Sequence, residues 1–321
     1  MLMLKNDFMT YTQETLSALV EAYPEMYELL DIDGGTSVSL AMKDIGQERV
    51  AVCMLGGGAG GPVLHYMVNE GLADASVLGL PSAAPNAYAI YETGKLLGKK
   101  GVIFMYNNYM GDRVNAQYGV EMLRKDGIDA YEIGIADDMM TQISEARYKR
   151  NGKLALIYAV KIAAACARKG YSAEEIYNMM KKLNERCATI TCVVDEEKDT
   201  VGFGAGFSGE PPVVERPLVD LKDIVDYVAG LLIEDVGLRE NEKAYALVNK
   251  LCGVHITDAY LANKYMKDRL ESYCDVGKVQ FGSFANLNMT VSYAFEFCLL
   301  MADEEMREML EGCAKTQLFW I

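Results

Sequence analysis

The sequence predicts an α/β protein of two domains, the first a largely parallel sheet flanked by helices and the second a smaller mixed sheet with helices. Strand-like and helix-like segments alternate along the chain. Val50–Leu55 is a continuous apolar run that ends in glycines, which is typical of a buried parallel strand. The pattern changes near Arg186, and 321 residues are enough for two compact domains. We therefore place the first domain at residues 1–185 and the second at residues 186–321.

Hydrophobic periodicity predicts the elements of the first domain in order. An amphipathic helix is expected over residues 10–30, interrupted by Pro24. Ser172 is the expected N-cap of the last helix. Strands are expected at 50–55, 76–80, 101–106 and 130–135, and further helices at 63–70, 86–97, 113–125, 153–169 and 173–185.

The second domain is expected to begin with two strands joined by an acidic turn. No Gly/Ser-rich or Pro-rich linker precedes it, so we expect the two domains to pack closely. Thr257 is the expected N-cap of a helix that runs to about Tyr273. Strands are expected at 187–194, 200–205, 244–248, 278–284 and 290–299, and the other helices at 221–232 and 303–313.

Charge and composition exclude several classes of partner. The 31 Lys and Arg against 46 Asp and Glu give a net charge of −15, which repels nucleic acid and anionic lipid. The chain has no apolar run of the roughly 18 residues that a membrane-spanning helix needs. Its start lacks the character of a secretion signal, and its eight cysteines include no Cys-x-x-Cys pair. We therefore expect a cytoplasmic protein with reduced thiols and no structural metal.

A glycine-rich loop, Gly56–Gly61, follows the first buried strand, with Pro62 at the expected start of a helix. Backbone amides in such a loop can hold an oxygen-rich ligand. The spacing also satisfies a dinucleotide-binding fingerprint, but Leu80-Pro81-Ser82 stands where that fold needs an acidic residue. A cradle for a small ligand is the favoured interpretation, and a purely structural turn is the alternative.

Asp112 closes the stretch Tyr106–Asp112 at the end of the most apolar strand, where ligands of parallel sheets gather. It is suited to act as a general base, or merely to cap a helix that begins at Arg113. A second glycine cluster, Gly202–Pro212, fits a sharp turn after a strand and fails the nucleophile-elbow pattern because of Glu210.

Histidine is scarce, since His65 and His255 are the only two in the chain. His65 is expected one turn into the helix that follows the glycine loop, and His255 in a surface loop. The sequence contains neither a P-loop nor a protein-kinase signature, so no nucleotide site is predicted on this chain.

These motifs together resemble the substrate-binding subunit of dihydroxyacetone kinase. The shared patterns are GGG-x-G, NYxGD, GExP-x-x-x-RP and LxMT, and their combination is far more specific than any one of them. The resemblance runs through nearly the whole chain in the same order, at residues 10–28, 52–65, 102–112, 133–138, 149–170, 204–218, 246–249 and 284–290.

The resemblance implies two α/β domains with the site between them. In it, Asp112 handles the reacting hydroxyl of the substrate, the loop glycines line the cradle and Ser82 makes a contact. The chain itself would bind no cofactor, because in the family the phosphoryl donor belongs to a separate nucleotide-binding kinase subunit or to a fused nucleotide domain. A homodimer is also implied. The substrate-binding residues expected on this basis are Gly57, Gly58, Gly60, Gly61, Ser82, Ser208 and His65.

Two positions depart from the family pattern. Gly61 replaces the loop histidine, whereas His65 is kept. Ser208 replaces the histidine that bonds covalently to the substrate carbonyl in the family, and a serine has no nitrogen with which to form that adduct. We therefore expect phosphoryl transfer to a small polyhydroxylated metabolite that is held without a covalent bond. A catalytically inactive regulatory or metabolite-binding paralogue is the alternative, and an NAD(P)-dependent oxidoreductase, which rests on glycine spacing alone, is a remote one.

Overall fold

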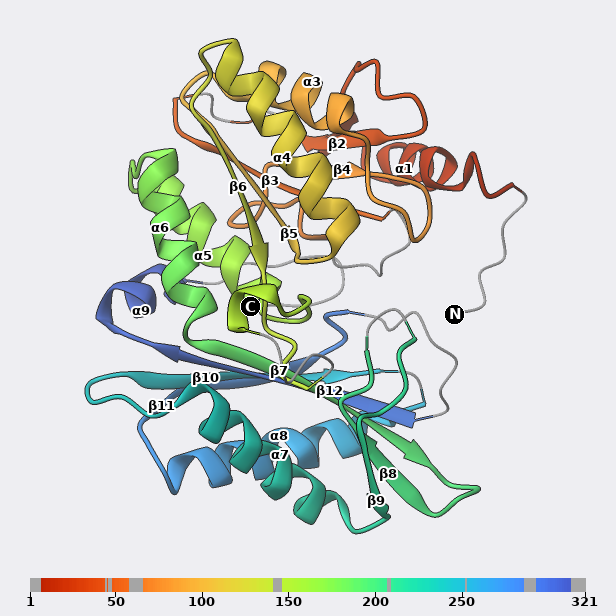
Figure 1. Ribbon diagram of the computed structural model, residues 1–321, viewed down its shortest axis with the longest axis vertical. Coiled ribbons are helices and arrows are strands. Elements are labelled where there is room, and N and C mark those ends of the chain that lie inside the picture. The colour runs from red at the N-terminus through yellow and green to blue at the C-terminus, as the bar shows by residue number, and fades with distance from the viewer. Residues whose placement is uncertain are drawn as a thin grey trace.

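Two six-stranded sheets lie one above the other in the computed structural model of the chain, with helices between them and on their outer faces (Figure 1). The structure describes residues 7–43, 45, 48–57, 66–140, 146–206, 209–251, 253–285 and 293–312. The two sheets with their helices confirm the predicted α/β fold of two domains, and the boundary near residue 185 stays a prediction.

The first sheet is parallel in its centre and at one edge. Its strand order is β1-β2-β4-β3-β5-β6. The strands β4, β3, β5 and β6 run parallel to one another, whereas β2 is antiparallel to both of its neighbours, β1 and β4. β3 is buried along its whole length, as expected for a strand covered by helices on both faces. The bounds are β1 Tyr27–Leu29, β2 Val38–Met42, β3 Ala51–Gly56, β4 Ala75–Leu78, β5 Val102–Asn107 and β6 Ala130–Ile135.

Helices cover both faces of this sheet. The helices α3, Ala87–Leu97, and α4, Met110–Lys125, form one apolar core with it. The helices α1, Tyr11–Ala22, α5, Leu156–Arg168, and α6, Ala173–Asn184, contribute to a core on the other face. A 3-10 turn, η1, at Arg147–Lys149 precedes α5.

The second sheet is mixed, as predicted, but the expectation that it is smaller is wrong, because both sheets have six strands. Its order is β11-β10-β12-β7-β8-β9, in which only the β10–β11 pair is parallel. The helices α7 and α8 pack on its lower face in Figure 1, and α5 lies between the two sheets. The bounds are β7 Cys187–Asp195, β8 Thr200–Phe203, β9 Val214–Pro217, α7 Leu221–Val236, β10 Lys243–Lys250, α8 Ile256–Glu271, β11 Val276–Gly282, β12 Tyr293–Ala302 and α9 Glu304–Leu310.

One apolar core joins the two sheets. It includes Val52 and Met105 of the first sheet, Leu156 of α5, and Leu247 and Cys298 of the second sheet, all of them buried. The expected close packing of the two domains is therefore confirmed. None of the helices in the described ranges is long and apolar enough to cross a membrane.

Several expected elements are wrong in their bounds. The helix expected over residues 10–30 ends at Ala22, and residues 27–29 form a strand because β1 pairs with β2. The strands β2 and β9 were not expected. Residues 63–65 of the helix expected at 63–70 lie outside the described residues, and its expected end is wrong, because Tyr66 is helical whereas residues 67–70 are not. The capping box of Ser172 with Glu175 confirms the start of α6.

Candidate functional site

Three of the predicted site residues come together where parallel strands of the first sheet end. Gly57 directly follows β3. A Cβ atom at Gly57 would lie 3.1 Å from the backbone nitrogens of both Ser82 and Ala83, in the loop after β4. The carboxyl end of a parallel sheet is the usual place for a ligand site. The close approach of these two loops therefore supplies one wall of a candidate site, and a side chain at position 57 would be crowded by the backbone of the loop after β4.

Ser82 has a left-handed backbone conformation, with φ of +63°. This conformation is costly for a residue that has a side chain, and such strained residues tend to cluster at functional sites. The turn brings Ala84 to the start of α4, because a Cβ at Gly111 would lie 3.3 Å from the Cβ of Ala84. The loop that contains Ser82 therefore packs against the first turn of α4, which carries Asp112.

Asp112 is the third residue of α4 and lies in its first turn. The expectation that Asp112 caps a helix beginning at Arg113 is wrong, because α4 begins at Met110 and Tyr109 is its N-cap residue. A carboxylate in the first turn interacts favourably with the positive end of the helix dipole. This position leaves the side chain of Asp112 available for a role other than capping.

The carboxyl group of Asp112 lies in a poorly solvated place. Its Oδ1 atom is buried and accepts no hydrogen bond from the described part of the chain. Burial disfavours the charged form and raises the pKa of Asp112 from 3.8 to about 7. A carboxylate with a pKa near neutrality can accept a proton from a hydroxyl and release it again, which suits a general base.

Asn107, which sequence analysis did not single out, is a further polar group of this site. It is the last residue of β5, and its buried Oδ1 atom accepts no hydrogen bond within the described ranges. Its neighbour Asn108 is fully engaged in structure, since its Nδ2 donates to the carbonyl oxygen of Arg150 at 2.8 Å and that of Tyr148 at 3.1 Å. Two amides directly after an apolar strand are the sequence signal that could have found Asn107.

The remaining predicted substrate-binding residues lie outside the described residues; they are Gly58, Gly60, Gly61, His65 and Ser208. Gly206 and Glu210 are joined by a hydrogen bond, in which the backbone N–H of Gly206 donates to the carbonyl oxygen of Glu210 at 2.9 Å. The sharp turn expected after β8 falls partly on residues 207 and 208, which lie outside the described residues.

His255 belongs to the structure of α8 and not to a site. It is the N-cap residue of α8, and its Nδ1 atom accepts a hydrogen bond from the backbone N–H of Thr257 at 3.4 Å. The expected cap at Thr257 is therefore wrong by two residues, because the imidazole nitrogen performs this task.

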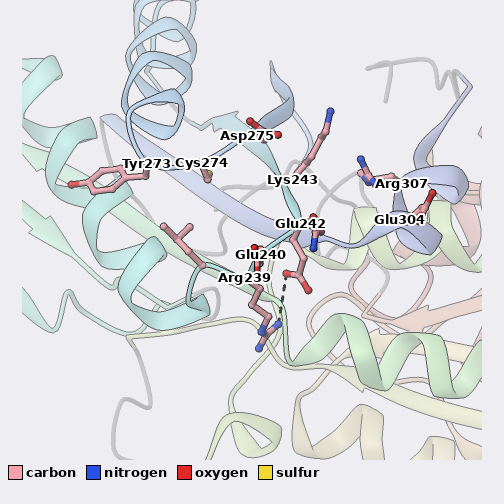
Figure 2. Close-up of a pocket in the computed structure, with 11 residues that line it drawn as sticks. Arg239, Glu240, Glu242, Lys243, Tyr273, Cys274, Asp275, Glu304 and Arg307 are labelled. Atoms are coloured by element: carbon pink, nitrogen blue, oxygen red, sulfur yellow. Dashed lines mark ion pairs between the residues drawn. The ribbon is translucent and has the colours of Figure 1, made fainter.

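A cavity of about 750 Å³ opens at a different place (Figure 2). Its lining includes Arg239 and Glu242, whose ion pair is 3.9 Å long, and Glu304 and Arg307 of α9. Lys243, at the amino end of β10, also lines it, whereas the motif residue Asn249 lies near the carboxyl end of that strand. The cavity contains none of the predicted site residues, and its charges are mixed, so we do not assign the function to it.

Comparison with known proteins identifies one family along nearly the whole chain. A family described as "Dak1 domain" matches residues 17–318. A curated relative, the dihydroxyacetone-binding subunit DhaK of PTS-dependent dihydroxyacetone kinase 2 from Listeria innocua, is 25% identical, and the match covers 98% of each chain.

Two solved structures show the same fold. One, described as regulation of the dha operon of Lactococcus lactis, has a TM-score of 0.84 at 22% identity and covers 98% of this chain and 96% of its own. The other is the dihydroxyacetone kinase of C. freundii in complex with AMP-PNP and Mg²⁺, with a TM-score of 0.83 at 19% identity. That match covers all of this chain but 61% of the longer kinase chain.

Proposed function

Because the chain belongs to the Dak1 domain family, we propose that it is the substrate-binding subunit of a dihydroxyacetone-kinase-like phosphotransferase. The observation that carries the proposal is the buried carboxyl group of Asp112, with a pKa of about 7, beside the Gly57 and Ser82 loops. The substrate is a small polyhydroxylated metabolite with a free hydroxyl. The phosphoryl donor is carried by a separate nucleotide-binding subunit.

In this mechanism Asp112 acts as a general base. Its ionised carboxyl group accepts the proton of the substrate hydroxyl while the hydroxyl oxygen forms a bond to the phosphorus of the donor. The bond between that phosphorus and the leaving group breaks, and the leaving group keeps the electron pair. Proton transfer to such a base contributes about 10²- to 10⁴-fold to a rate.

The substrate is held without a covalent bond. Ser208 stands where the family pattern has the histidine that bonds to the substrate carbonyl. Recognition then depends on hydrogen bonds to hydroxyl groups, for which the buried Oδ1 of Asn107 and the backbone amides after β3 are suited. A polyol without a carbonyl group is therefore an acceptable ligand, as well as a ketose.

A regulatory paralogue is the second candidate function. The replacement of the covalent histidine favours it, and the similarity to the L. lactis protein described by its role in operon regulation points the same way. Such a protein would bind the metabolite and dock on a partner without turnover. A homodimer is part of either proposal, and its mass in solution can be measured by light scattering.

A ligand screen with a turnover assay distinguishes the two. Thermal shift is measured with dihydroxyacetone, glyceraldehyde, L-erythrulose and glycerol, and intact mass under denaturing conditions reports any covalent adduct. Phosphorylation of each hit is then followed with a purified nucleotide-binding kinase subunit. Stabilisation without an adduct, and turnover that Asp112→Asn abolishes, are expected. Binding without turnover would support the regulatory paralogue, and no binding by any of these compounds would contradict both.

A further inference from the structure

A buried ammonium group lies where the two sheets meet. The side chain of Lys153 is 0% exposed. Its Nζ atom donates to the carbonyl oxygen of Ala205 at 2.6 Å and to Oγ1 of Thr191 at 2.8 Å, and it lies 3.3 Å from Oδ2 of Asp138. A buried cation is costly unless its protons are satisfied, and here three partners surround the three N–H groups. Such an arrangement tolerates little displacement of any partner.

The hydrogen bonds continue from Lys153 into the second sheet. Thr191 Oγ1 donates to Oε1 of Glu296 at 3.2 Å, and Nδ2 of Asn249 donates to Oε2 of Glu296 at 3.2 Å. Thr191, Glu296 and Asn249 are all buried. They lie on β7, β12 and β10, so the chain of bonds crosses three neighbouring strands.

The two ends of this network are hydrogen-bonded to the backbone of two segments that belong to the family motifs. Lys153 binds Ala205, within the glycine-rich segment after β8. Asn249 binds the other segment, because its Oδ1 accepts from the backbone N–H of Phe284 at 2.7 Å and its Nδ2 donates to the carbonyl oxygen of Ala285 at 3.0 Å. The network therefore orders both motif segments of the second sheet.

The network also contacts the site of the first sheet. Gly152 precedes Lys153, and a Cβ at Gly152 would lie 2.7 Å from the Cα of Asn107. Asp138 lies shortly after β6, the strand that pairs with β5. The glycine-rich segment approaches the same region, since a Cβ at Gly204 would lie 2.6 Å from the Cβ of Met140.

We propose that Lys153 is a positioning residue, which holds the backbone at Ala205 in register with the end of β5 and so sets the distance between the second-sheet motif segment and Asp112. Lys153 does not touch the substrate. It acts through the carbonyl oxygen of Ala205, and a polar network of this kind keeps its geometry only while every member is satisfied. The link to ligand binding rests on the proposed function.

The experiment compares Lys153→Met with a matched control, Lys161→Met. Lys161 is also a buried lysine, and its Nζ donates to the carbonyl oxygen of Gly312 at 2.9 Å, far along the chain from the motif segments. Hydrogen exchange is measured for the peptides that contain residues 203–206 and 284–285, and for α4 as a reference. Lys153→Met is expected to speed hydrogen exchange in both motif segments and to leave exchange in α4 unchanged. Lys161→Met is expected to speed exchange in neither motif segment.

Binding of dihydroxyacetone and L-erythrulose as probes supplies the second measurement. Lys153→Met removes the charged group of the network and is expected to weaken probe binding by about 10- to 100-fold. Lys153→Arg keeps the charge and is expected to restore part of the lost affinity. If Lys153→Met does not fold, Thr191→Val removes the hydroxyl bridge with little change of shape. Unchanged exchange at 203–206 in the folded variants would overturn the positioning role. If the wild-type protein binds neither probe, the proposed function fails, and the exchange measurement still decides the role of Lys153.

Discussion

Two effects act in opposite directions on the carboxyl group of Asp112. The first turn of a 16-residue helix favours the anion, whereas removal from water favours the neutral acid. Burial is the larger effect, because it raises the pKa to about 7. Glu296, buried in the second sheet, has its pKa raised to about 7 for the same reason. Their placement separates them, since Asp112 belongs to the candidate site and Glu296 to the Lys153 network.

Turnover is expected to rise with pH through about 7, because Asp112 accepts a proton only when it is ionised. The measurement is kcat/KM for phosphorylation of dihydroxyacetone or L-erythrulose between pH 5 and pH 9. Glu296→Gln serves as the control and should show the same rise of kcat/KM through about pH 7. If kcat/KM does not change between pH 5 and pH 9, or if its rise disappears in Glu296→Gln, the assignment of Asp112 as the base is contradicted.

Asp112→Asn is expected to change how stability depends on pH. In the unfolded chain the carboxyl group ionises near 3.8, whereas in the folded protein it stays protonated up to about 7. The unfolded state therefore binds fewer protons between these values, and the stability of the wild-type protein falls as pH rises through this window. The contribution of Asp112 has a slope of at most about 1.4 kcal/mol per pH unit, which solvent access reduces.

The measurement is urea unfolding of wild type and Asp112→Asn at pH 4.5 and pH 7.5. The variant should gain stability relative to wild type at the higher pH. A difference that is the same at both pH values would show that Asp112 titrates normally.

At the scale of elements, the position of α4 depends on its close packing against α3. Gly119 of α4 faces Ile90 and Ala87 of α3, and a Cβ there would lie 2.8 Å from Ile90 Cγ2 and 2.9 Å from the carbonyl oxygen of Ala87. Because a carbonyl oxygen in a helix cannot move aside, a methyl group would push α4 away. The same helix carries Asp112, so the packing also sets the place of the carboxyl group.

Gly119→Ala is therefore expected to lower the free energy of unfolding by about 1–3 kcal/mol, although alanine favours helices. The control is Gly230→Ala in the middle of α7, where a Cβ would meet no atom within 4 Å. This control should raise stability by up to about 1 kcal/mol through helix propensity. Denaturant unfolding measures both, and equal effects of the two changes would contradict the packing argument.

At the scale of the whole molecule, an ion cluster ties the segment before α5 to the second domain. Arg150 forms two hydrogen bonds with the carboxylate of Asp235 on α7, at 2.7 and 2.8 Å. Arg147 donates to the same carboxylate at 2.6 Å and to the carbonyl oxygen of Cys187 at 2.7 Å. One carboxylate thus holds two guanidinium groups, and both sheets share an apolar core nearby. We expect the molecule to unfold as one unit.

Asp235→Ala is expected to cost about 3–5 kcal/mol, because it leaves largely buried guanidinium groups without their partner. Asp226→Ala on the same helix is the control, since its pair with the exposed Lys222 is worth about 0.5 kcal/mol or less. Thermal unfolding followed by calorimetry measures both. A second transition in the wild-type protein, or equal effects of the two changes, would contradict the role of the cluster.

The fold class and most of the elements could be predicted from the amino-acid sequence, which also singled out Asp112 as a candidate site residue. Apolar runs such as Val50–Leu55 and a cap signal such as Ser172 act within a few residues, so they can be recognised along the chain. Neither β2, which lies between β1 and β4, nor the edge strand β9 could be predicted, because the stability of each comes from its partner strands. The first turn of α4 was likewise missed, since no side chain caps it.

The packing of sheets and helices brings together residues that are distant in the sequence. The approach of Gly57 to Ser82, the buried oxygen of Asn107 and the bond from Lys153 to Ala205 each join segments that are separated in the chain. The raised pKa of Asp112 also depends on what covers the carboxyl group and not on its neighbours in sequence. Burial and contact between distant segments arise when sheets and helices pack, so they cannot be predicted from periodicity along the chain.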